Sequence, residues 1–174
     1  LVQKLSKSMK NLKFGAYTDS TNDFGPVITK QHQQSVINHI SSAEKQGANI
    51  VVDGRDAVVS GYENGFYVGG TLIDKVTPQM DSYKAEIFGP VLQIVRVATM
   101  KDAMSLIDNH EYGNGTCIFT RDGEAARYFS DHIKVGMVGV NIPLPVPVAY
   151  HSFGGWKRSL FGDLHAYGPD SIRF

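Results

Sequence analysis

The chain has 174 residues, with 17 basic and 17 acidic side chains and a formal net charge of zero. Because charges of both signs are mixed along the chain, the sequence excludes the one-sided positive surface of proteins that bind nucleic acid or anionic membranes. No apolar run approaches the roughly 20 residues of a membrane span. We therefore expect no nucleic-acid partner and no membrane, and predict a small-molecule ligand or another subunit as the partner.

Cysteine content and the two chain ends add further expectations. Cys117 is the only cysteine, which excludes an internal disulfide and favours a reducing compartment, with a cytoplasmic location as the default. The chain begins on Leu1 without a starting methionine and lacks the apolar core of a signal peptide. We predict a single domain over residues 1–174 that is truncated at both ends.

The first half of the chain combines helical and extended patterns. Apolar residues recur at three- and four-residue steps over the first dozen residues, which predicts a helix, and a long polar loop follows. Thr29 lies where it can cap a second helix over residues 30–46. Apolar, β-branched runs then predict three strands, in ANIVVDGRDAV, FYVGGTLIDKV and EIFGPVLQIVRV.

The second half of the chain alternates strands and helices. Helical spacing appears in MKDAMSLIDNHEYG and DGEAARYFSDHIK, and short apolar strands in GTCIFT and GMVGVN. This alternation predicts an α/β domain with a largely parallel sheet, and ligands at the carboxyl ends of its strands. From NIPLPVPVAY onward, prolines and glycines predict irregular, exposed backbone.

One pentamer, Glu86-Ile87-Phe88-Gly89-Pro90, suggests cofactor chemistry. A carboxylate there could accept hydrogen bonds from ribose hydroxyls. An aromatic ring two residues later lies on the same side of an extended chain, where it could pack against a flat heterocycle. Ordinary turn chemistry before a buried strand is the alternative interpretation of the spacing.

Four separated motifs make the chain similar to the catalytic domain of the aldehyde dehydrogenase superfamily: EIFGPV, YGNGTCIFTRD, GMVGVN and SFGGWKRS. Within that superfamily, DGRDAVVSGYENGFYVG and NIPLPVPVAYHSFGGWKRSLFGDLHAYGP resemble the CoA-acylating methylmalonate-semialdehyde dehydrogenases. The resemblance implies a three-layer α/β catalytic domain, of which this chain would be the C-terminal portion. It also implies that the Rossmann domain lies outside the chain.

The resemblance also implies a reaction. Methylmalonate or malonate semialdehyde would be oxidised to propionyl-CoA or acetyl-CoA, with NAD as hydride acceptor and coenzyme A as co-substrate, in a homo-oligomeric parent enzyme. Glu86 would bind the nicotinamide ribose, Phe88 would flank the nicotinamide ring, and Phe153 would line the aldehyde end of the site. No catalytic residue is assigned, because the nucleophilic cysteine of the family is expected before Leu1, so the isolated chain would be inactive. A non-acylating dehydrogenase and a non-catalytic assembly or cofactor-contact module are the alternatives.

Other reactive side chains have structural interpretations that we favour. Cys117, in GTCIFT, is expected to pack as a small buried hydrophobe. Lys157 and Arg158, after Gly154-Gly155, could cradle a phosphate of coenzyme A, but we favour a lysine that donates to backbone carbonyls. His151 and His165 are either proton carriers or structural histidines, and we favour the latter. The remaining pair on the second helix, His32 and His39, lacks the ligand spacing of a metal site, so we predict no metal and solvated side chains.

Overall fold

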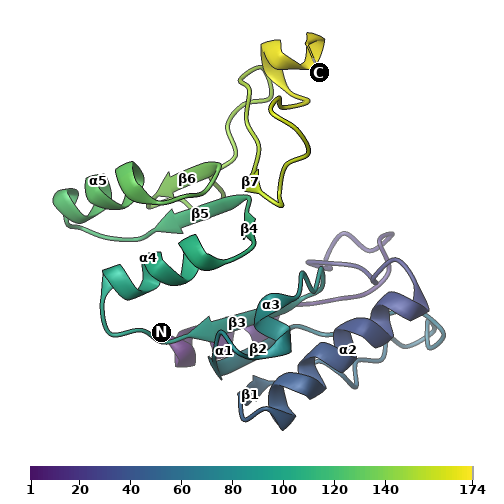
Figure 1. Cartoon of the computed structure of the whole chain (residues 1–174). Coiled ribbons are helices and arrows are strands. Elements are labelled where there is room, and N and C mark those ends of the chain that lie inside the picture. The colour runs from purple at the N-terminus through teal and green to yellow at the C-terminus, as the bar shows by residue number, and fades with distance from the viewer. Residues whose placement is uncertain (174) are drawn as a thin grey trace. The chain divides into compact units, whose positions relative to one another are not determined.

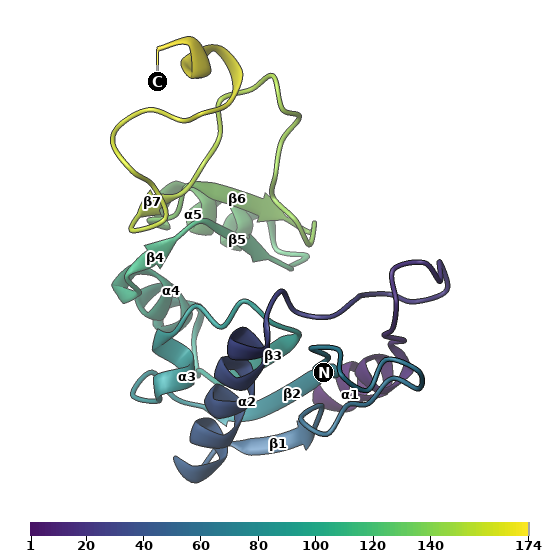
Figure 2. The same cartoon turned by 90° about the vertical axis from the view of Figure 1, so that its right-hand side faces the viewer.

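The computed structural model describes residues 1–173 and forms two compact units, residues 1–96 and 97–173 (Figures 1 and 2). Each unit combines helices with small sheets that contain a parallel strand pair. The α/β class expected from the sequence is confirmed. Among residues 1–173, no helix has both the length and the apolar character needed to cross a membrane.

A three-stranded sheet forms the centre of the first unit, in the order β1–β2–β3. Its strands are β1 (Asn49–Val52), β2 (Thr71–Val76) and β3 (Val91–Val95). β2 and β3 are parallel, whereas β1 runs antiparallel to β2. A parallel partner requires a crossover connection, usually a helix. Residues 53–70, which connect β1 to β2, contain no helix, and β2 runs antiparallel to β1.

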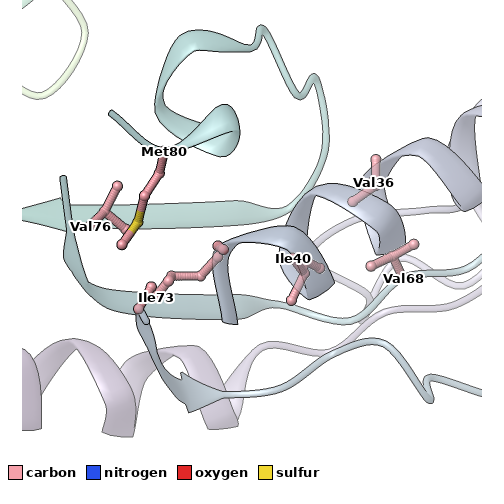
Figure 3. Packing of buried hydrophobic residues seen from close by; sticks show 8 residues of the cluster. Val36, Ile40, Val68, Ile73, Val76 and Met80 are labelled. Atoms are coloured by element: carbon pink, nitrogen blue, oxygen red, sulfur yellow. The ribbon is translucent and has the colours of Figure 1, made fainter. Parts of the chain in front are cut away.

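Helix α2 (Lys30–Lys45) supplies the core of the first unit. The Thr29 side chain accepts a hydrogen bond from the His32 amide at 3.1 Å, which confirms the expected N-cap. Full burial of an aliphatic side chain contributes about 1.5–3 kcal/mol, so the apolar stripe of α2 anchors the unit. The buried cluster is shown in Figure 3 and consists of Val36, Ile40, Ala43, Ala48, Val68, Ile73, Val76 and Met80. Helix α1 (Val2–Asn11) contacts β1 and β2.

The buried carboxylate of Asp74, in β2, forms an ion pair with Arg96, the last residue of the first unit. Arg96 donates to the two Asp74 oxygens at 3.0 and 2.6 Å. These hydrogen bonds lower the pKa of Asp74, because they stabilise its ionised form. The β2 strand therefore carries a charge in its interior that is satisfied within the unit.

The second unit contains the strand–helix–strand motif that the sequence predicts. Strands β5 (Gly115–Ile118) and β6 (Met137–Val140) are parallel and are joined through α5 (Gly123–His132). Asp122 caps α5 by accepting from the amides of Glu124 and Ala125. Helix α4 (Met100–Asn109) precedes β4 (Tyr112–Gly113). The buried core of this unit comprises Met104, Phe129, Ile133 and Val135.

The end of the chain is irregular, as the prolines and glycines predict. Within residues 141–173, the regular elements are β7 (Trp156–Lys157), which pairs antiparallel with β4, and a 3-10 helix over Gly168–Ile172. Sequence patterns do not predict β4, β7 or α3 (Asp81–Lys84), because elements of two to four residues show no measurable period.

Candidate functional site

The segment with Glu86 and Phe88 joins α3 to β3 in the first unit. Both side chains are exposed, and Phe88 is 79% accessible to solvent. Phe88 has a positive φ of 54°, in the left-handed region. The expectation of an extended backbone through Phe88 is therefore wrong, because a left-handed residue ends an extended segment.

Three contacts fix this turn to the rest of the unit. Nε2 of His32 lies 2.8 Å from the carbonyl oxygen of Phe88, so His32 is not the purely solvated helix residue that was expected. A Cβ at Gly89 would lie 2.8 and 3.0 Å from the methyl groups of Val36, and only glycine fits there without a shift. The Pro90 carbonyl accepts from the Thr71 amide at 2.9 Å. A disfavoured conformation persists where its surroundings determine it in this way.

The exposed pair has the chemistry of a binding surface. Within residues 1–173 the Glu86 carboxylate has no hydrogen bond or ion pair, so its oxygens are available to hydroxyl donors. The ring of Phe88 offers a flat apolar face to a planar group. The residues therefore fit a ligand with hydroxyl groups beside an aromatic ring, as a nicotinamide riboside has.

The second unit contains a cavity of about 400 Å³ whose wall includes Phe153. The ring of Phe153 stacks on Tyr167, with centroids 4.4 Å apart and an interplanar angle of 18°. The half-buried ring of His165 also lines the cavity, whereas His151 is exposed and lies against Tyr150, 4.3 Å between ring centroids. Phe153 belongs to the second unit, and Glu86 and Phe88 belong to the first.

Lys157 is fully used in holding the end of α4. Its Nζ donates to the carbonyl oxygens of Ile107, Asp108 and His110 at 2.9, 3.0 and 3.1 Å. The last carbonyls of a helix have no partner within the helix, so a lysine can satisfy them. The structural interpretation of Lys157 is confirmed, because the carbonyl oxygens engage all three of its N–H groups.

Arg158 is also paired. Its guanidinium donates to the Glu111 carboxylate and lies above the Tyr112 ring, 5.6 Å from its centroid. The hydrogen bond to Glu111 raises the pKa of Arg158. Both charged side chains are substantially exposed, so the pair contributes little to stability.

Backbone contact holds the glycine-rich segment beside β6. A Cβ at Gly136 would overlap the carbonyl oxygen of Gly154 and lie 2.8 Å from the Cα of Gly155. The two segments can approach so closely because Gly136 has no side chain. The start of β6 and the segment that follows Phe153 are therefore joined through main-chain atoms.

Cys117 lies in β5 as expected, but it is half-buried and not fully enclosed. A Cβ at Gly139 of β6 would lie 3.1 Å from its Sγ, so the thiol packs against the neighbouring strand. It is absent from the cavity wall. Among residues 1–173, no group of three His, Cys, Asp or Glu side chains is arranged to hold a metal ion.

Comparison with known proteins identifies the family. The model of the aldehyde dehydrogenase family matches residues 1–174, and the chain belongs to this family. It is 65% identical over 174 residues to the malonate-semialdehyde dehydrogenase of Pseudomonas aeruginosa, a match that covers 100% of this chain and 35% of the relative.

Two solved structures have nearly the same fold over this chain. The methylmalonate-semialdehyde dehydrogenase of Oceanimonas doudoroffii is 77% identical, with a TM-score of 0.96, over 99% of this chain and 36% of that one. A protein of Sinorhizobium meliloti assigned to the methylmalonate-semialdehyde dehydrogenases, in complex with NAD, is 56% identical. Its TM-score is also 0.96, over 99% of this chain and 35% of that one.

The chain thus spans about a third of the length of these relatives. The matches confirm the family and the fold that the four motifs imply. They do not support the expected placement of the chain as the C-terminal portion of the catalytic domain. The contacts described above all lie within residues 1–173 and do not depend on that placement.

Proposed function

We propose that the protein containing this chain oxidises malonate or methylmalonate semialdehyde with NAD and passes the acyl group to coenzyme A, with loss of carbon dioxide. Acetyl-CoA or propionyl-CoA would be the product. The observation that carries the proposal is the 77% identity, over 99% of this chain, to the methylmalonate-semialdehyde dehydrogenase of Oceanimonas doudoroffii. The relative from Pseudomonas aeruginosa, at 65% identity, is named for the malonate substrate.

Glu86 and Phe88 would hold the cofactor, and bound NAD would accept the hydride. Support comes from the NAD complex of the Sinorhizobium meliloti relative and from the exposed, unpartnered side chains of both residues. The Glu86 carboxylate would accept hydrogen bonds from ribose hydroxyls, and the Phe88 ring would cover one face of the nicotinamide. Both assignments use side chains that have no structural role within the first unit.

Phe153 would line the aldehyde end of the site. Its stacking on Tyr167 fixes the orientation of the ring at the cavity wall, which favours a role in shaping a pocket. The small acyl chain of a semialdehyde would need such an apolar surface beside its reacting carbon.

The nucleophilic thiol would come from outside these residues. Cys117 is half-buried in β5 against Gly139 and does not line the cavity, whereas a reactive thiolate needs an accessible site. The isolated chain would therefore be inactive. The complete enzyme would function as a homo-oligomer.

The test is the formation of NADH by the full-length protein, followed by absorbance with semialdehyde and NAD, with and without coenzyme A. We expect turnover that depends on coenzyme A. In the same assay, Glu86→Gln should raise KM for NAD roughly ten-fold, because a hydrogen bond to an ionised acceptor is stronger than one to a neutral amide by about 1 kcal/mol or more.

The matched control is Glu124→Gln, which removes an exposed carboxylate from α5 in the second unit and should leave KM for NAD unchanged. An unaltered KM in Glu86→Gln would reject the cofactor role of Glu86. NADH formation that continues without coenzyme A would instead identify a non-acylating dehydrogenase. No turnover and no NAD binding by the full-length protein would reject the enzyme assignment.

A further inference from the structure

We propose that His32 is a positioning residue for the cofactor, which holds Phe88 in the conformation that presents its ring. This inference rests on the proposed NAD-binding role of residues 86–88. His32 acts through the backbone of Phe88 and would not itself touch the cofactor.

The contact between His32 and Phe88 defines which ring nitrogen of His32 carries a proton. Nε2 of His32 lies 2.8 Å from the carbonyl oxygen of Phe88, across 56 residues of sequence. A carbonyl oxygen only accepts hydrogen bonds, so Nε2 must be the donor. Because the direction of a carbonyl follows the ψ angle of its residue, this bond fixes the backbone at Phe88 itself.

Phe88 needs such a contact because its conformation is disfavoured. A φ of 54° brings the Cβ of a non-glycine residue close to the following carbonyl group. No buried packing compensates, since the ring is 79% exposed. Without the histidine, the turn would relax toward extended conformations and the ring would sample other directions.

Helix α2 is well placed to hold the turn. His32 lies in its first turn, where the amide of the same residue donates to the Thr29 cap. The neighbouring Gln33 side chain donates to the Tyr67 carbonyl at 2.7 Å, and Val36 fills the space beside Gly89. The histidine therefore projects from a fixed point of the unit.

We expect removal of His32 to weaken cofactor binding more than stability, because the residues that His32 orders lie outside the buried core. Glu86 and Phe88 are exposed, and the buried cluster of the first unit does not include them. Removing the hydrogen bond should disorder this segment and leave the packing of α2 on the sheet in place. A histidine that served stability alone would lower the unfolding midpoint without affecting cofactor affinity.

The experiment compares His32→Ala, His32→Gln and His39→Ala in the full-length protein. His39 is a half-buried histidine seven residues along the same helix, and within residues 1–173 it forms no hydrogen bond with residues 86–90, so His39→Ala is the matched control. The readouts are the Kd for NAD by titration, amide hydrogen exchange over residues 86–91 without cofactor, and the thermal midpoint.

We expect His32→Ala to raise the Kd about five- to ten-fold, as the loss of one ordering hydrogen bond would. Exchange over residues 86–91 should become faster, and the midpoint should fall no further than in His39→Ala. His32→Gln should restore the Kd to within about two-fold of the original, because its amide nitrogen can donate in place of Nε2.

Two results would overturn the proposal: an unchanged Kd in a folded His32→Ala, or a glutamine variant as weak as the alanine variant. If the unaltered protein binds no NAD at all, the proposed function fails first. Hydrogen exchange then tests the hold on Phe88 separately, and equal exchange in the unaltered protein and His32→Ala would overturn it as well.

Discussion

Phe88 and Lys157 are two of the four non-glycine residues with positive φ among residues 1–173, and they use their side chains in opposite ways. Phe88 in the first unit has a φ of 54°, and Lys157 in the second has a φ of 55°. The ring of Phe88 is exposed and has no partner within residues 1–173, whereas the amine of Lys157 donates to three carbonyls at the end of α4. The same backbone conformation thus leaves the Phe88 side chain exposed to solvent and directs the Lys157 side chain to the carbonyl groups at a helix end.

The difference shows that a strained backbone does not by itself identify a binding residue. Strain at Lys157 is explained by the contacts that its side chain makes. Strain at Phe88 is maintained by its neighbours, His32 and Gly89 among them, and the side chain is left free. The residue whose side chain is free is the stronger candidate for function.

Replacing Lys157 with Gly should have the largest effect on stability. Glycine relieves the left-handed backbone, but the carbonyls of α4 lose three hydrogen bonds from a charged donor, and we expect a loss of about 2 kcal/mol. The measurement is the free energy of unfolding in denaturant. Lys101→Ala, which removes an exposed lysine from α4, is the control and should change it little.

Replacing Phe88 with Gly should have a smaller effect of the opposite sign. Glycine relieves the same backbone strain, and no side-chain contact is lost in exchange. The free energy of unfolding should therefore stay the same or rise by about 1 kcal/mol. NAD affinity should nevertheless fall, because the ring is gone. Phe119→Ala, at an exposed phenylalanine of the second unit, should leave NAD affinity unchanged. Equal stability losses at Phe88 and Lys157 would remove the distinction between the two residues.

Replacing Cys117 with Ala should have the smallest effect. The side chain is half-buried against Gly139, so we expect a packing loss of at most about 1 kcal/mol. Turnover of the full-length enzyme should persist in the NADH assay. Complete loss of turnover in a folded variant would identify Cys117 as the nucleophile.

Much of the fold follows from local pattern. Helix α2 was predicted from its apolar spacing and from Thr29, and both the helix and the cap are present. The β5–α5–β6 motif was also predicted, since the periodicity of a strand or a helix can be recognised within a short stretch of sequence. The antiparallel direction of β1 was not, because an apolar run indicates a strand without indicating the direction of its partner.

The site was less predictable, for a physical reason. The motif EIFGP identified Glu86 and Phe88, and both side chains are exposed. The left-handed conformation of Phe88 depends on His32, 56 residues away, and such a contact leaves no local signal in a single sequence. The same holds for Lys157, whose three carbonyl partners lie 47 to 50 residues before it.

The contact between Gly136 and Gly154-Gly155 bears on redesign of the cavity in the second unit. Since Gly136 meets the main-chain atoms of these residues, the contact does not use the side chain of the preceding residue, Phe153. We therefore expect the segment to keep its attachment to β6 when Phe153, in the cavity wall, is replaced, although the stacking on Tyr167 would change. A library at this position that keeps all three glycines fixed would vary the pocket and preserve its frame.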